Sequence, residues 1–246
     1  MCTVVFGWNA LGSDTLLLAA NRDEDPRRPS AGPRRLHESP RVVGGMDLTA
    51  GGTWLAIRER RSLVAVLNRR DPDRISPPPR RRSRGLLALQ IAASGNGDPR
   101  VCAEAARLLL GADLYAPCSL LIAGPEAALL VSHAGGGPPR VEKVAAGWHV
   151  ITHQELDDAS EPRAAWLASE LARFTPRDRD EAERQLDVWL ASHGNPGPPV
   201  CLHEGPVVTV STSRVWLAAD GVGYRHGEGP AHAATWTDWT TLITEN

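Results

Sequence analysis

The chain opens with MCTVVFGW at residues 1–8 and continues, after a short polar turn, with TLLLAANRDE at residues 15–24. Residues 3–8 and 15–20 are rich in apolar, β-branched and aromatic residues, and Gly12-Ser13-Asp14 between them is typical of a turn, so we expect a two-stranded hairpin. Antiparallel pairing brings the start of the first strand to the end of the second. The sequence therefore predicts that Cys2 lies beside Asn21-Arg22-Asp23-Glu24, at the exit of the second strand.

Cys2 combines two reactive groups if Met1 is removed, and the small size of cysteine leads us to expect that removal in the cell. A thiol with an ordinary pKa of about 8.5 is only a few per cent thiolate at neutral pH, whereas an α-amine with a pKa of about 7.7–8.0 can accept its proton. One residue would then supply both nucleophile and base. The alternative is that Cys2 is a small buried residue at the start of a strand.

The composition indicates a chain that folds as one domain. With 246 residues, 42% of them hydrophobic, it can bury a substantial core, and we expect a single domain over residues 1–246. The formal net charge of −2 gives no global basic field. Arginines do cluster in residues 27–35 and 80–84, but among Pro and Ser rather than aromatic residues, so we expect solvated loops and no nucleic-acid partner.

Several further classes of protein are not favoured. The first residues lack the pattern of a signal peptide, and no apolar run approaches the ~18 residues of a membrane span, so we expect a cytoplasmic protein with no membrane partner. The four cysteines lack CxxC spacing, which predicts free thiols. Cys201 and His203 form a Cys-x-His pair without a third or fourth ligand at a recognisable spacing, so we expect no metal site and no other cofactor.

Beyond the first hairpin, the chain shows strand-like and helix-like blocks. Residues 25–40, rich in Pro, Arg and Ser, predict a surface loop, and residues 51–57 with 62–68 predict a second hairpin. Prolines at 77–79 then interrupt the chain. Helical spacing predicts one helix pair within residues 86–109 and another within residues 166–190, the second closed by Gly194. Further strands are expected at residues 118–123, 127–132, 148–152, 207–210, 215–218 and 222–225.

The order of these blocks predicts the fold class. Strands, two helices, strands, two helices and strands follow one another without strict βαβ alternation. Two mainly antiparallel sheets faced by helices fit this order better than a doubly wound parallel sheet. We therefore expect an α+β fold.

Three motifs give the sequence a family resemblance: Met-Cys at the start, Asn-Arg-Asp-Glu at residues 21–24, and Gly-Gly-Thr-Trp-Leu-Ala-Ile at residues 51–57. With them the chain resembles the NRDE family of the transport and Golgi organisation protein two type, most strongly over residues 1–70. The resemblance implies the N-terminal-nucleophile hydrolase fold, a four-layer αββα sandwich. It also implies kinship with enzymes that cleave linear amide bonds with a terminal cysteine.

The same resemblance implies catalytic roles. Cys2 matches the nucleophile, and Arg22 with Asp23 matches the pair that flanks the thiol and the amine. A guanidinium near Cys2 favours thiolate, and a carboxylate can hold the α-ammonium or its proton. Asn68 is in the place where the family usually shows an Asn after a strand, and its amide would stabilise an oxyanion.

A second group of residues is expected to bind substrate, namely Asn21, Glu24, Gly51, Gly52, Thr53, Trp54 and His153. The two glycines permit close backbone approach, so residues 51–54 line the pocket in this interpretation; the alternative is a tight turn with a core tryptophan. Residues 151–154 read Ile-Thr-His-Gln. Relatives tend to carry an Asn there, so a second oxyanion donor is either missing or replaced by His153.

Three functions stay open at this level. The first is a hydrolase that cleaves a linear amide C–N bond of a small molecule through an acyl-enzyme on Cys2. The second is a non-catalytic binding or transfer protein for haem or an acyl thioester, with some of the eight tryptophans lining its pocket. The third is an acyltransferase that uses the same thiol. The substrate and the oligomeric state are not indicated.

Overall fold

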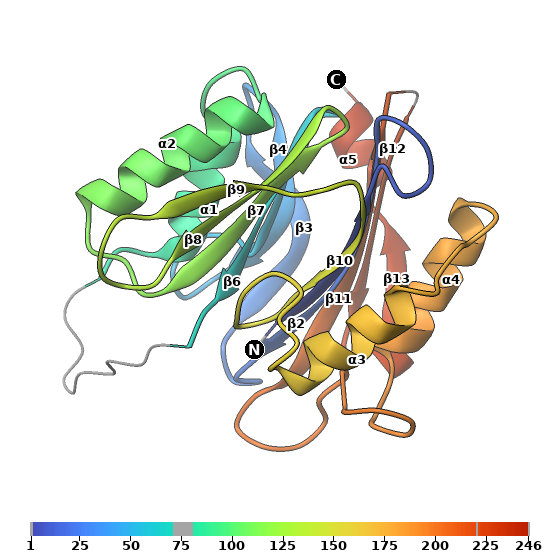
Figure 1. The fold of residues 1–246 in the computed structure, drawn as a ribbon. Helices are drawn as coiled ribbons and strands as arrows, with labels where there is room; N and C mark the ends of the chain where they lie inside the picture. The colour runs from blue at the N-terminus through green and yellow to red at the C-terminus, as the bar shows by residue number, and fades with distance from the viewer. Residues whose placement is uncertain (1, 71–80, 220, 246) are drawn as a thin grey trace. The chain divides into compact units, whose positions relative to one another are not determined.

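The computed structural model describes residues 2–70, 81–219 and 221–245 (Figure 1), and these form two compact units. The first unit comprises Met1–Arg28 and Ala146–Thr241, and the second comprises Pro29–Ala145 and Leu242–Asn246. Each unit contains one antiparallel sheet and a pair of helices on one face of it. That both units make one domain over residues 1–246 stays a prediction.

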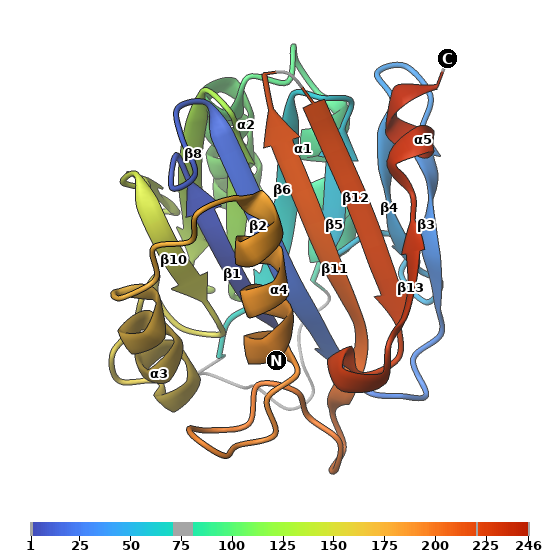
Figure 2. The ribbon, with the colours of Figure 1, turned by 90° about the vertical axis from the view of Figure 1, so that its right-hand side faces the viewer.

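The first unit contains a six-stranded sheet in the order β10-β1-β2-β11-β12-β13. Its strands are β1 (Thr3–Trp8), β2 (Thr15–Glu24), β10 (Gly147–Ile151), β11 (Val208–Ala218), β12 (Gly221–Glu228) and β13 (Thr235–Asp238). Helices α3 (Pro162–Leu171) and α4 (Arg179–Leu190) cover one face of this sheet (Figure 2). A short 3-10 helix, η1 (Ala231–Ala233), follows β12.

The helix-covered face of this sheet carries the apolar core of the first unit. Val5 and Leu17 from the first hairpin pack with Leu167 of α3 and Leu186 of α4. Both helices begin with a side-chain cap, because a carboxylate of Glu161 accepts from the backbone of α3 and one of Asp178 accepts from the backbone of α4. Each helix is therefore held by the burial of its apolar residues and by a side-chain hydrogen bond to a backbone N–H of its first turn.

The second unit contains a seven-stranded sheet whose strands are neighbours in chain order from β3 to β9. They are β3 (Ser30–His37), β4 (Val42–Asp47), β5 (Leu55–Arg58), β6 (Ser62–Asn68), β7 (Cys118–Gly124), β8 (Ala127–His133) and β9 (Arg140–Lys143). Helices α1 (Arg84–Ala93) and α2 (Pro99–Ala112) lie on one face (Figure 1) and complete a second apolar core. The last helix, α5 (Thr240–Thr244), contains the boundary between the two units.

The two predicted hairpins, the two helix pairs and the strands at 118–123, 127–132 and 148–152 are confirmed, but residues 25–40 are not only a loop. They include β3, which pairs with β4 at the edge of its sheet, with register shifts between Ala31 and Arg34 and between Arg35 and His37. An edge strand tolerates the missing N–H of Pro33 and the exposed arginines. The loop-like composition is thus that of an edge strand.

Three boundaries also differ from the prediction. Residues 21–24 are the last four residues of β2 rather than its exit. The strands predicted at 207–210 and 215–218 are one strand, β11, because its polar middle continues the ladder with β2. Helix α4 ends at Leu190, where the N–H of Ala191 bonds to Asp187, so Gly194 lies in the next loop and does not close the helix. The prolines at 77–79 lie outside the described residues.

Within the described ranges, no helix is both long enough and apolar enough to cross a membrane.

Gly52 makes the closest backbone contact of the turn before β5. A Cβ added there would lie 2.3 Å from the carbonyl carbon of Gly85, at the start of α1. We expect Gly52→Ala to lower the free energy of unfolding by about 1–3 kcal/mol, because backbone must move to admit the methyl group. Gly136→Ala is the matched control, since an added Cβ there meets nothing within 4 Å. Equal denaturant midpoints for the two variants would contradict this account.

Candidate active site

The register of the β1–β2 hairpin places the predicted nucleophile. Thr3 pairs with Asn21 at the open end of the hairpin. Continuing this register by one residue sets Cys2 opposite Arg22. Because directly opposed residues in an antiparallel pair project to the same face, Cys2 and Arg22 share one face of the sheet. Asn21 and Asp23 project to the other.

Asn21 and Asp23 lie on the face that α3 and α4 cover. They have the same alternation as Leu17 and Ala19, which belong to the core beneath these helices. The amide of Asn21 donates to the carbonyl oxygens of Leu190 at 2.8 Å and of Val200 at 3.2 Å. Asn21 therefore anchors the end of α4 and the loop after it, and its predicted contact with substrate stays a prediction.

Asp23 lies in a buried polar network on this face. Its Oδ1 accepts a hydrogen bond of 2.7 Å from Thr209 Oγ1, and its Oδ2 lies 3.3 Å from Arg163 Nη1. Arg163 also donates to Thr3 Oγ1 at 3.1 Å and lies 3.6 Å from Glu161 Oε1. Burial raises the pKa of Asp23, while the bond from Thr209 and the charge of Arg163 lower it. The carboxyl group is thus held in place from the neighbouring strand β11 and from helix α3.

Arg22 occupies the opposite face with a different set of neighbours. It is buried, and its Nη2 lies 4.0 Å from Glu24 Oε2, which also lies 3.8 Å from Arg28 Nε. His226 of β12 is buried and its Nδ1 shares a 2.8 Å hydrogen bond with Ser213 Oγ. Burial, and then the charge of Arg22, lowers the pKa of His226 to about 4. His226 is therefore neutral at pH 7 and does not repel the Arg22 guanidinium.

Residues on both faces of β2 shift the pKa of the Cys2 thiol. Burial raises its pKa, and so does the negative charge of Asp23; the backbone N–H of Asp23 and the charge of Arg22 lower it. Burial prevails, so the pKa lies above its usual value. The predicted effect of Arg22 has the expected sign but does not yield a thiolate. A neutral thiol needs a base that removes its proton during attack.

His153 lies at the same end of the sheet as Cys2. Strand β10 pairs with β1 up to Val4 and Ile151, and the chain then bends. His153 follows two residues later and is buried. The structure thus brings Cys2, Arg22, Asp23 and His153 to one end of three adjacent strands.

The remaining predicted site residues belong to the second unit. Asn68 is the exposed last residue of β6, where it pairs with Cys118. Residues 51–54 precede β5 and form a tight turn: Gly51 has φ +70°, and Thr53 Oγ1 donates to Leu55 O at 2.8 Å. The half-buried Trp54 packs against Gly45. Residues 51–54 thus form a tight turn, but Trp54 is not a core residue. The pocket role of residues 51–54 and the oxyanion role of Asn68 stay predictions.

Sequence reasoning missed the residues that hold Asp23 and the histidine that lies near Arg22. Arg163 is in the first turn of α3, far from β2 in the chain, and no spacing connects them. Thr209 and His226 lie on β11 and β12, whose order in the sheet is not readable from the sequence. The one available signal was the cap pattern Glu161-Pro162, which marks a helix start but not its neighbour.

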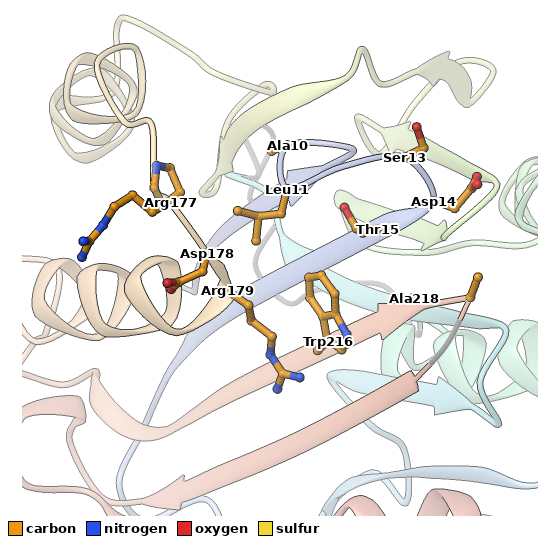
Figure 3. Close-up of a pocket in the computed structure, with 12 residues that line it drawn as sticks. Ala10, Leu11, Ser13, Asp14, Thr15, Arg177, Asp178, Arg179, Trp216 and Ala218 are labelled. Atoms are coloured by element: carbon orange, nitrogen blue, oxygen red, sulfur yellow. The ribbon is translucent and has the colours of Figure 1, made fainter.

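A shallow hollow of the first unit lies at the other end of the hairpin (Figure 3). Leu11, Asp14, Arg179 and Trp216 are among its lining residues, and the Arg179 guanidinium lies 5.1 Å from the Trp216 ring centre. It surrounds the β1–β2 turn, whereas Cys2 lies at the open end. The hollow is therefore separate from the residues described above.

The model of the Transport and Golgi organisation 2 family matches residues 1–191. The chain belongs to this family. The family membership predicted from the three motifs is thereby confirmed. No curated protein matches the chain.

Solved structures show the fold of this family member. A Caenorhabditis elegans ortholog of N-acylethanolamine-hydrolyzing acid amidase is similar with TM-score 0.60 and 13% identity, covering 87% of this chain and 92% of that one. The C2A mutant of conjugated bile acid hydrolase from Clostridium perfringens has TM-score 0.50 and 12% identity, covering 97% and 96%. Another variant of that hydrolase has TM-score 0.54 and 13% identity, covering 100% and 94%. These likenesses confirm the predicted α+β N-terminal-nucleophile hydrolase fold.

Arg163 should be essential for the buried network around Asp23. We expect Arg163→Ala to lower the free energy of unfolding by about 3–5 kcal/mol, because it leaves a buried carboxylate without its partner. Arg173→Ala is the control, since Arg173 is exposed and its pair with Glu170 contributes at most about 1 kcal/mol. Denaturant unfolding of both variants measures the difference. A loss for Arg163→Ala as small as the control's would show that the network does not stabilise the fold.

His226 should make stability fall on acidification. Its pKa is about 4 in the folded chain against 6.5 in a free side chain, so between these values the unfolded chain binds a proton that the folded chain does not. Stability is therefore lost as pH falls from 6.5 towards 4, by on the order of 3 kcal/mol. We expect this slope to be smaller in His226→Asn than in the exposed control His37→Asn, as measured by denaturant unfolding across that range. Parallel slopes would disprove the assignment.

Proposed function

We propose that the protein is an N-terminal-cysteine hydrolase that cleaves a linear amide C–N bond of a small molecule. The observation that carries the proposal is the hairpin register, which sets Cys2 opposite Arg22 and beside Asp23. The fold supports it, because the amidase and the bile acid hydrolase with this fold are both described as hydrolases. The exchange in the C2A hydrolase is at a cysteine second in its chain, the position that Cys2 has here.

The reaction begins with a thiol rather than a thiolate. With Met1 removed, the α-amine of Cys2 takes the thiol proton while Sγ bonds to the substrate carbonyl carbon. The C–N bond then breaks, and the proton passes to the leaving amine. Water next attacks the thioester, gives its proton to the α-amine, and releases the acid and the free thiol.

The residues around Cys2 suit the steps of this reaction. The Asp23 carboxylate acts electrostatically on Cys2 and favours a protonated amine next to it, which forms when the thiol is deprotonated. Thr209 and Arg163 keep this carboxylate in one position. Arg22 supplies positive charge on the Cys2 face, where negative charge develops on the substrate oxygen. Backbone N–H groups are the further donors that we propose for that oxygen.

Labelling of Cys2 by an electrophilic amide probe tests the proposal. We expect the wild-type protein, made without an N-terminal tag, to gain one acyl adduct, and Cys2→Ala to gain none. Cys118→Ala is the matched control, because Cys118 is buried and its pKa is raised to about 12, so this variant should label like the wild type. Intact mass measures the adduct and also shows whether Met1 has been removed. Equal labelling of wild type and Cys2→Ala would refute the proposal.

A further inference from the structure

Four metal-binding side chains meet in the first unit, in a cluster that the reaction at Cys2 does not use. Cys201 and the histidines His193, His203 and His232 each offer one ligand atom, and these atoms all lie within 4.8 Å of one another. The first three come from the loop between α4 and β11, and His232 comes from η1. The fold thus supplies the third and fourth ligands for the Cys201-x-His203 pair, which sequence spacing did not reveal.

The cluster is close to the geometry of a tetrahedral zinc site. Cys201 Sγ lies 3.7 Å from His232 Nδ1, and two such ligands on one zinc ion are about 3.6 Å apart when the Zn–S bond is ~2.3 Å and the Zn–N bond ~2.0–2.1 Å. The ring of His193 lies 3.9 Å from that of His203 and 4.5 Å from that of His232, between ring centres. The four ligand atoms lie within 4.8 Å of one another, whereas ligand atoms on one tetrahedral zinc ion lie about 3.3–3.6 Å apart, so the exposed histidine side chains would rotate to close on the ion.

The four side chains of the cluster differ in their exposure to solvent. Cys201 is fully buried, whereas the three histidines are exposed. The backbone N–H groups of Val200 and Cys201 both donate to Ser192 O at 2.9 Å, which fixes the loop around the thiol.

Three imidazoles packed ring to ring are hard to explain as a purely structural cluster. When protonated they repel one another, and their mutual contact buries little apolar surface. A divalent ion removes both difficulties, because it binds the neutral rings and the thiolate together. No acidic side chain is among the four, so the donor set is nitrogen and sulfur, which suits Zn²⁺ rather than Mg²⁺ or Ca²⁺.

We propose that His193, Cys201, His203 and His232 form a structural zinc site. Four protein ligands complete the tetrahedron and leave no open position for a reacting water, which is the pattern of structural rather than catalytic zinc. The ion would join the loop after α4 to η1, and η1 also contacts α4 and β11.

The consequence of the zinc site extends to the residues around Asp23. Leu202, between two of the ligands, exchanges hydrogen bonds of 2.9 Å with Thr209, and Thr209 donates to Asp23. Val200, next to Cys201, accepts a hydrogen bond from Asn21. The loop between α4 and β11 lies at the same end of the sheet as the N-terminus (Figure 2). The ion therefore fixes a loop that supports residues 21–24 from the helix-covered face.

Zinc content and thermal stability test the site directly. The protein is purified without a polyhistidine tag, loaded with Zn²⁺, and freed of excess metal by gel filtration. We expect one zinc per chain by elemental analysis, a higher Tm than in the chelator-treated protein, and loss of both in His203→Asn. His37→Asn is the control, because His37 is exposed and bonds to Pro40 O outside the cluster; it should keep the zinc and the rise in Tm.

Co²⁺ identifies the thiolate ligand. Co²⁺ bound in place of zinc should give a thiolate-to-metal charge-transfer band in wild type that is absent in Cys201→Ser. If Cys201→Ser fails to fold, the exposed variants His193→Asn and His203→Asn decide the matter. Zinc far below one per chain in the loaded wild type, or full zinc in His203→Asn, would overturn the proposal. Neither result affects the labelling of Cys2, so failure of this site is distinguishable from failure of the hydrolase.

Discussion

The antiparallel pairing of β1 with β2 is the constraint on which the rest of the candidate site depends. Side chains alternate along β2, so the register decides which of residues 21–24 share a face with Cys2. Arg22 does, and Asp23 does not. A slip by one residue would exchange the two faces and place a buried carboxylate where the guanidinium now lies. The slip would also disturb the packing beneath α3 and α4, because Val5, Leu17 and Ala19 would leave the face that these helices cover.

Burial dominates the electrostatics at both key groups. It raises the pKa of the Cys2 thiol and of the Asp23 carboxyl against the opposing charges of Arg22 and Arg163. The thiol is consequently protonated at rest, and a neutral thiol is less readily oxidised than a thiolate. In the proposed hydrolase, the thiolate is generated only when base and substrate are both in place. The Asp23 network is thus better understood as positioning a charge than as activating sulfur in advance.

The sequence predicted local patterns well and contacts between distant segments poorly. Alternation and helical spacing predicted the hairpins and helix pairs, because these depend on neighbours in the chain. The sequence did not predict β3, because an edge strand has the arginines and proline of a loop. Arg163, Thr209 and the cluster around Cys201 were missed for another reason. Their proximity comes from strand order and helix placement, which no spacing of residues encodes.

The position of β1 within its sheet has an energetic consequence for the reaction. This strand is hydrogen-bonded on both sides, to β2 and to β10, so the backbone at the start of the chain is already ordered before any substrate arrives. Chain ends in most proteins lose about 1–2 kcal/mol of conformational entropy per residue when they become fixed. Here folding has already supplied that ordering, so in the proposed hydrolase the binding energy can instead align the carbonyl group with the sulfur atom.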